Sequence, residues 1–220
     1  MRVRTLARAL AVAGCCVVPL TAQAQFTTYT TLASYLAALG STGTDTYDDL
    51  PIASTGSPLS RTAGAFTYRA TAISDVFFPG GAGSDHWLST NVAATVIVLD
   101  QFSSTVRGVG GNFFASDIGG AFVPTGQVTL FYDNGITFFT TLTNPTLSNF
   151  FGVISTFAPI TSFGVRTVTP NSASAPVWPT INNLVLGAAG NSVVPEPESF
   201  ALVAAGLLAI GAIARRRQRS

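Results

Sequence analysis

The chain has no lysine, only two cysteines and one histidine, and no glutamate between residues 25 and 194. Cys15 and Cys16 lie within the first 24 residues, so the remainder has no thiol for a disulfide or a thiolate metal site. Region 25–194 carries four arginines against eight aspartates, a net charge of −4. Because phosphate binding needs clustered cations, this balance argues against a nucleic-acid partner.

Motifs for catalysis are missing as well. His86 has no sequence pattern that marks a nucleophile and its base, and no nucleophile elbow, zinc-protease motif or phosphate-binding Gly-Lys loop is present. A glycosidase would have to use two of the aspartates, whose spacing does not suggest a pair. We therefore expect a protein that is not an enzyme, with an exported hydrolase as the less favoured alternative.

The N-terminus has the pattern of a signal peptide over residues 1–24. Arg2, Arg4 and Arg8 precede an apolar stretch at 9–20 and a small-residue cleavage site at 22–24, so signal peptidase would leave a chain that starts at Gln25. A lipoprotein box at 12–15 would instead acylate Cys15. The apolar stretch between Arg8 and Cys15 is short for that alternative, so we favour ordinary cleavage.

The C-terminal segment, residues 195–220, has three parts. It begins with Pro-Glu-Pro, continues as an uncharged apolar run at 199–214, and ends in a cluster of arginines; the motif and cluster residues are Val194, Pro195, Glu196, Pro197, Arg215, Arg216, Arg217 and Arg219. As a single transmembrane helix the run would reach about 24 Å, short of the roughly 30 Å hydrocarbon core, and could span it with local thinning. The arginines would stay on the cytoplasmic side, so the preceding domain would face away from the cytoplasm. A plain single-pass anchor also fits this pattern.

This order of export signal, globular region, Val-Pro-Glu-Pro, apolar helix and arginine cluster resembles the PEP-CTERM proteins of Gram-negative bacteria. The resemblance implies that an exosortase recognises Pro195, Glu196 and Pro197 and removes the segment at or near them. It implies transient anchoring in the inner membrane, followed by location at the cell surface or in the extracellular matrix, where such proteins take part in biofilm or floc formation.

Region 25–187 is expected to be one all-β domain, an antiparallel β-sandwich or jelly roll, with residues 188–194 as a linker. Leu32, Tyr35, Leu36 and Leu39 have helical spacing after a Thr31 N-cap, which predicts one short N-terminal helix. Runs rich in Val, Ile, Thr and Phe predict strands near residues 44–50, 66–72, 95–99, 106–114, 127–132, 136–142, 150–155, 160–168 and 181–186. The Asp-Asn-Gly at 133–135 predicts a β-hairpin between two of them.

Three segments also resemble, more loosely, the β-sandwich domains of other PEP-CTERM proteins. They are the acidic strand end at 46–50, the glycine-rich segment at 105–113 and the Ile-Asn-Asn-Leu at 181–184. Such domains are often likened to lectins and carbohydrate-binding modules. The resemblance therefore implies a sandwich of this kind, for which a ligand has usually not been demonstrated.

A glycine-rich loop at 79–91 holds the first candidate ligand-binding residues. Asp85, His86 and Trp87 place a carboxylate, an imidazole and an indole side by side, and sugar recognition uses an aromatic face with polar neighbours. Trp178, between two prolines, is a fourth candidate. The alternative, which we favour, is that Trp87 plugs one end of the sandwich while Asp85 and His86 face water, and Trp178 poses the same choice.

Asp45, Asp48 and Asp49 form a second candidate, a structural Ca²⁺ site near the first strand. Carboxylate oxygens are the ligands that Ca²⁺ prefers, and Asn182 and Asn183 would lie nearby if the first and last strands pair. The alternative is a solvated acidic turn, which we favour because adjacent residues of a strand point to opposite sides. No other cofactor is expected.

The sequence thus predicts an exported surface or matrix protein, with weak binding of exopolysaccharide as its suggested role. The alternative is a structural protein that associates with itself and binds no small ligand. Paired phenylalanines at 77–78, 113–114, 138–139 and 150–151 bear on this choice, because outward-facing members could form an apolar patch.

Overall fold

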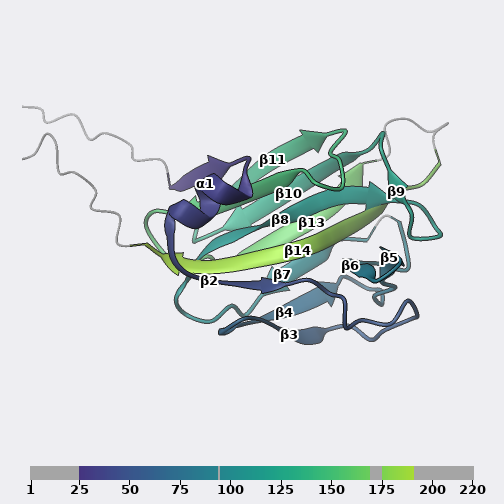
Figure 1. Cartoon of the computed structure of the whole chain (residues 1–220), viewed down its shortest axis with the longest axis horizontal. Helices are drawn as coiled ribbons and strands as arrows, with labels where there is room; N and C mark the ends of the chain where they lie inside the picture. The colour runs from purple at the N-terminus through teal and green to yellow at the C-terminus, as the bar shows by residue number, and fades with distance from the viewer. Residues whose placement is uncertain (1–24, 94, 169–174, 191–220) are drawn as a thin grey trace, which may run out of the picture.

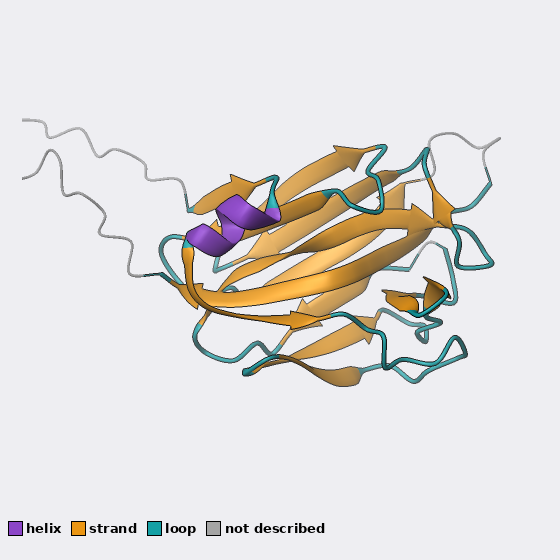
Figure 2. Cartoon of the chain, viewed as in Figure 1, coloured by secondary structure: helices purple, strands orange, loops and turns teal. Residues whose placement is uncertain are grey.

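The computed structural model describes residues 25–93, 95–168 and 175–190 (Figure 1). These residues form two antiparallel sheets packed as a sandwich with one short helix (Figure 2), which confirms the predicted fold class. The signal peptide, the Pro-Glu-Pro motif, the apolar run and the arginine cluster lie outside the described residues. Within the described ranges, no helix is long and apolar enough to cross a membrane.

The strands divide between the sheets in the following way. The first sheet contains β1 (Phe26–Tyr29), β2 (Leu39–Asp45), β5 (Gly80–Ala82), β6 (Asp85–Ser89), β8 (Val106–Ser116), β9 (Phe122–Val123), β12 (Phe150–Ser155) and β14 (Trp178–Ala189). The second sheet contains β3 (Leu59–Ala63), β4 (Phe66–Ala72), β7 (Ile97–Asp100), β10 (Gln127–Asp133), β11 (Thr137–Thr143) and β13 (Ser162–Val168). The spatial orders are β1-β12-β8-β14-β6-β5, with β2 beside β14 and β9 beside β8, and β11-β10-β13-β7-β4-β3.

The core lies between the two sheets and is built from alternating positions of their strands. Val109 and Phe113 of β8 face inward, and Phe113 stacks on Phe163 of β13 with ring centroids 5.2 Å apart. Leu130 and Tyr132 of β10 belong to the same cluster. Because alternate residues of a strand face one side, the residues between them form the outer face of each sheet.

The hairpin predicted from Asp-Asn-Gly is confirmed. β10 and β11 pair antiparallel from Gln127 opposite Thr143 to Asp133 opposite Thr137. Gly135 has φ of 111°, a conformation that favours glycine, and its N–H donates to the Asp133 carboxylate at 2.8 Å. The local sequence is therefore sufficient to specify this turn.

Helix α1 (Leu32–Ala37) is also confirmed, with Thr31 as its N-cap. It packs on the outer face of the first sheet, where Tyr35 is fully buried and donates to the carbonyl oxygen of Val185 at 3.2 Å. A Cβ at Gly108 or Gly152 would come within 2.8 Å of the Tyr35 side chain. The glycines of β8 and β12 thus make room for the helix.

Several predicted boundaries differ from the structure. The strand predicted at 44–50 is wrong for most of its length, because β2 ends at Asp45, whose carboxylate accepts the N–H of Tyr47 at 3.1 Å. Tyr47 then has φ of 65°, which breaks the extended chain. Strands β1, β3, β5, β6 and β9 were not predicted. β14 extends to Ala189, two residues beyond the predicted end of the domain, and pairs there with β2.

Candidate binding groove on the first sheet

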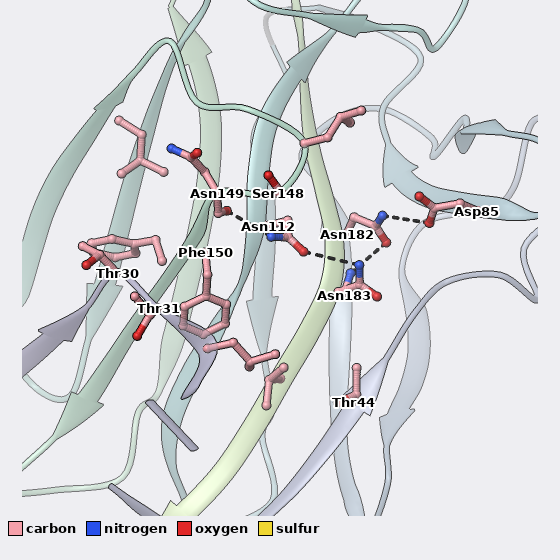
Figure 3. A pocket seen from close by; sticks show the side chains of 15 residues that line it. Thr30, Thr31, Thr44, Asp85, Asn112, Ser148, Asn149, Phe150, Asn182 and Asn183 are labelled. Carbon is pink, nitrogen blue, oxygen red and sulfur yellow. Dashed lines mark hydrogen bonds between the residues drawn. The ribbon is translucent and has the colours of Figure 1, made fainter. Parts of the chain in front are cut away.

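A groove of about 870 Å³ lies on the outer face of the first sheet (Figure 3). Residues of β8, β12 and β14 line it centrally, together with Asp85 of β6, Thr44 of β2 and Leu142 of β11, the edge strand of the second sheet. Residues 30–32, which lead into α1, and residues 147–149, which lead into β12, also line it. Segments distant in the sequence therefore converge on one hollow.

A β-bulge in β14 brings two neighbouring asparagines to this hollow. Asn182 pairs with Asn112 of β8, but the next pair is Val185 with Gly110, so β14 has one extra residue between them. Bulges re-aim side chains that would otherwise point to opposite faces. Asn183 adopts φ of 49°, which asparagine tolerates better than most residues. Both Asn182 and Asn183 consequently line the groove.

Asp85, Asn182, Asn183, Asn112 and Asn149 form a continuous hydrogen-bonded chain, which we call the amide row (Figure 3). Asn182 Nδ2 donates to Asp85 Oδ1 at 2.9 Å, and Asn182 Oδ1 accepts the backbone N–H of Asn183 at 2.8 Å. Asn183 Nδ2 donates to Asn112 Oδ1 at 3.3 Å, and Asn112 Nδ2 donates to the carbonyl oxygen of Asn149 at 3.1 Å. Among the described residues, no hydrogen bond reaches Oδ1 of Asn183 or Oδ2 of Asp85. The row therefore keeps acceptors for a ligand.

An aromatic ring lies beside the amide row. Phe150 is half-buried and lines the groove, and its ring contacts Tyr35 with centroids 5.1 Å apart. The ring occupies space left by Gly110, where a Cβ would come within 2.7 Å of the Phe150 Cζ atom. The glycine-rich segment of β8 thus makes room for both the helix and this ring.

The structure does not bring Asp85, His86 and Trp87 to one surface. Asp85 is exposed at the groove, whereas the Nδ1 atom of His86 lies 2.7 Å from the carbonyl oxygen of Leu50. Trp87 is only 2% exposed, stands edge-on to Phe114, and donates its indole N–H to Gly120 at 3.1 Å. The ring of Trp87 therefore offers no open face to a ligand, in agreement with the plug alternative.

Trp178 lies elsewhere, at the start of β14. It is half-buried, and its indole N–H donates to the carbonyl oxygen of Asn91 at 3.1 Å. It lines a separate hollow of about 260 Å³ with Phe78, Ile118 and residues near them. Trp178 is thus the predicted aromatic that remains accessible, but it does not share a surface with Asp85.

The three aspartates of the predicted calcium site have other partners. Asp45 is 5% exposed and accepts two hydrogen bonds from Arg61 at 3.0 and 2.6 Å. Arg61 also donates to both oxygens of Asp49 at 2.7 Å, and this guanidinium lowers the pKa of Asp49. Asp48 accepts the N–H of His86 at 3.0 Å, and this bond lowers its pKa. A cation of the protein itself thus occupies the position between Asp45 and Asp49.

No group of three histidine, cysteine or acidic side chains is close enough to hold a metal ion in the part of the chain that the structure describes. The calcium hypothesis supposed that the strand holding Asp45 pairs with the last strand, and β2 does pair with β14. Asp45 of β2 lies opposite Leu184 of β14. The carboxylate, however, turns to Arg61 of β3.

Two tyrosines complete the arrangement around Asp45. Tyr68 donates its hydroxyl to Asp45 Oδ2 at 2.7 Å, and the hydroxyl oxygen of Tyr47 lies 3.0 Å from that of Tyr68. Burial raises the pKa of both phenols far above the ordinary value, with the nearby Asp45 charge adding to the shift. Together, Asp45, Tyr47, Asp49, Arg61 and Tyr68 form what we call the Asp45–Arg61 network. It links β2 of the first sheet with β3 and β4 of the second.

Sequence reasoning missed most of the groove. It named Asp85 as a ligand-binding candidate, but Asn182 and Asn183 as neighbours of a metal site and as part of a segment with a loose family resemblance. Asn112 was likewise named only within such a segment, and Phe150 only as part of a pair that could form an apolar patch. The signal that could have found them was the adjacent Asn-Asn pair within an apolar strand, since such a pair favours a bulge with a left-handed residue. Nothing local indicates that Asn112 and Phe150 face the same hollow.

Comparison with known proteins gives one match. The model of the PEP-CTERM protein-sorting motif matches residues 193–218. No curated protein and no solved structure matches the chain significantly. The match covers the C-terminal segment and leaves the sandwich to be interpreted from its own geometry.

Proposed function

Since the chain carries a PEP-CTERM sorting motif, which marks an exported, cell-surface-associated substrate of exosortase, we propose that its sandwich binds a neutral polysaccharide of the extracellular matrix. The binding site is the groove that contains the amide row. The amide row is the observation that carries this proposal. Processing at the motif delivers the domain to the compartment where such polymers occur.

The chemistry of the groove favours a polyhydroxylated ligand. A carboxamide offers both N–H donors and a carbonyl acceptor, and a sugar hydroxyl likewise donates and accepts. Asn112 and Asn183 expose such groups beside the hydroxyl side chains of Thr30, Thr31 and Ser148. Phe150 supplies an apolar face for the C–H side of a sugar ring. Pockets of this composition, apolar surface with a few placed polar groups, are typical of small-molecule sites.

The charge of the groove favours a neutral ligand. Asp85 is the single charged residue among those that line it, and no arginine lines it. A polyanionic polymer would meet this carboxylate and the net charge of −4 of the region without a compensating cation. Binding should therefore prefer uncharged glycans and change little with salt concentration.

The same lining favours binding over hydrolysis. Glycoside hydrolysis generally uses two carboxylic acids on either side of the bond that breaks. The groove supplies one carboxylate, Asp85, and the imidazole of His86 is directed to Leu50 instead. We therefore infer a binding module without a catalytic role.

The test uses the processed protein, purified from an exosortase-bearing host that expresses the full chain. Calorimetry with a neutral exopolysaccharide and with a polyanionic one should show binding to the neutral polymer alone. Asn112→Ala should weaken that binding about tenfold, because it removes one amide from the row and leaves Nδ2 of Asn183 without its acceptor. Trp178→Phe, in the separate hollow, is the matched control and should bind as the unmodified protein does. Binding that survives Asn112→Ala but disappears in Trp178→Phe would transfer the site to that hollow.

A further inference from the structure

The free edges of the two sheets differ in how well they are protected. The outermost strands are β1 and β5 in the first sheet and β11 and β3 in the second. β5 has three residues, β1 has four and ends just before α1, and β3 has five and carries Arg61. Short edge strands and charged side chains are the usual devices that prevent edge-to-edge pairing.

β11 has none of these devices. It spans seven residues, and residues 136–145 around it contain no charged side chain. It lies at the top of the second sheet in Figure 1, and within the described ranges it is paired with β10 on one side and with no strand on the other. Its side chains are Thr, Phe and Leu, which favour strand pairing. Its outer backbone groups are therefore available to another strand.

We propose that β11 pairs antiparallel with β11 of a second copy of this chain, with Thr140 on the two-fold axis. The strand sequence, Thr-Phe-Phe-Thr-Thr-Leu-Thr, is nearly self-complementary about this residue. In that register Phe138 lies opposite Leu142 of the other copy, and Thr137 lies opposite Thr143. On the inner side the apolar Phe138 and Leu142 meet on either side of the Thr140 pair, and on the outer side Thr137 meets Thr143 and Phe139 meets Thr141.

The inner side of this pairing continues the core. Phe138 and Leu142 are half-buried and already pack against the core cluster, and Phe138 contacts Phe26 with ring centroids 5.1 Å apart. Pairing with a second copy would cover the flank that they leave open. Each copy would add an equivalent flank, which is the property of an isologous interface.

The outer side explains an exposed aromatic residue. Phe139 is 68% exposed, and its ring lies beside that of Phe131, with centroids 6.4 Å apart. In the proposed register Phe139 lies opposite Thr141 of the other copy and diagonal to that copy's Phe139. Diagonal neighbours are about 7–8 Å apart and within reach of aromatic side chains. The two Phe139 rings would thus shield each other.

A single cysteine tests the register directly, because region 25–194 has none. Thr140→Cys would place two cysteines at the axis with Cα atoms about 4.5–5.5 Å apart, within the range for a disulfide. Thr137→Cys is the matched control, since its two copies would lie about 20 Å apart along the strands. Under mild oxidation of the processed protein, Thr140→Cys should form a cross-linked dimer at least tenfold faster than Thr137→Cys. Equal rates, or faster cross-linking at 137, would overturn the register.

Charge substitutions test the interface without a covalent bond. Phe139→Lys and Thr141→Glu should each weaken the association seen by sedimentation velocity about tenfold, because each buries an unpaired charge. The double variant places each lysine opposite a glutamate of the other copy and should recover most of the loss. Both positions are exposed, so neither substitution should disturb the fold of one copy. Thermal melts followed by circular dichroism can verify this.

The unmodified protein must associate for the proposal to hold. A single monomeric species up to the solubility limit would overturn it, as would a dimer that none of these substitutions affects. The amide row and Phe150 lie on the first sheet, and of the β11 residues Leu142 alone also lines the groove, so Phe139→Lys and Asn112→Ala test dimerisation and glycan binding separately. If both hold, each dimer carries two grooves, and a polymer that spans both would be bound with increased avidity.

Discussion

The Asp45–Arg61 network and the amide row are both sets of polar side chains on β-strands, yet they differ in burial and in how many of their polar atoms have hydrogen-bond partners. In the Asp45–Arg61 network, the 5% exposed Asp45 accepts hydrogen bonds from Arg61 and Tyr68. In the row, neutral amides line an open groove, and acceptor atoms of Asp85 and Asn183 remain without partners among the described residues. Buried charges must be paired to be tolerated. The comparison assigns stability to the first constellation and ligand binding to the second.

The largest expected effect on the free energy of unfolding comes from breaking the Asp45–Arg61 network. Arg61→Met should lower the free energy of unfolding by about 3–5 kcal/mol, because it leaves a buried carboxylate without its partner. Chemical denaturation of the processed protein measures this change. The matched control is Arg166→Met, an exposed arginine of β13, for which we expect a change within about 0.5 kcal/mol. Equal effects of the two substitutions would contradict the structural role of the Asp45–Arg61 network.

A substitution in the amide row should leave stability nearly unchanged and weaken glycan binding. Asn183→Gly suits the left-handed backbone at this position, so the free energy of unfolding should change by less than about 1 kcal/mol. Glycan binding should nevertheless weaken severalfold, because the side-chain amide is lost. Calorimetry and denaturation of the same preparation measure both quantities. A large loss of stability with unchanged affinity would reverse the assignment of the two regions.

Asn183→Ala sharpens this prediction. Alanine removes the same amide but tolerates positive φ poorly, so an additional cost of about 1 kcal/mol is expected. Affinity should fall to the same extent as in Asn183→Gly. If alanine and glycine gave equal stability, the left-handed conformation of the bulge would be called into question.

A smaller effect concerns acid. Hydrogen bonds and the nearby guanidinium lower the pKa of Asp49, and hydrogen bonds from Thr137 and Gly135 lower that of Asp133. The unfolded chain therefore binds protons at a higher pH than the folded one. Their contribution is complete above the ordinary carboxyl pKa of about 3.9 and is lost as the pH falls through the lowered values. Denaturation between pH 5 and 3 should show declining stability, with a shallower decline in Asp49→Asn; an identical slope would contradict this account.

The sequence predicts the parts of this fold that local chemistry decides. Asp-Asn-Gly specified the turn between β10 and β11, and Thr31 with Tyr35 specified the helix. The strand at 44–50 failed because an aspartate side chain captured a backbone N–H and ended β2 early. Short strands such as β5 and β9 carry too few residues for a periodic pattern, and they form because β6 and β8 are already in place.

The site was less predictable because its residues meet only through the fold. Asp45 and Arg61 are 16 positions apart, and no local sequence pattern predicts that they form an ion pair where a metal ion was expected. Asn112 and Asn183 are 71 positions apart and meet across β8 and β14. Trp87 was named for its chemistry, but Gly120 provides a partner for its indole N–H in the interior. Residue type suggests a role, whereas pairing and burial decide it.

The most direct test of the central claim is the NMR spectrum of side-chain N–H groups in the processed protein during titration with a neutral matrix oligosaccharide. The account predicts that the amide signals of Asn112 and Asn183 shift in proportion to ligand bound, while the indole signals of Trp87 and Trp178 stay in place. Indole shifts without amide shifts would show that the ligand binds elsewhere and would contradict the assignment of the groove.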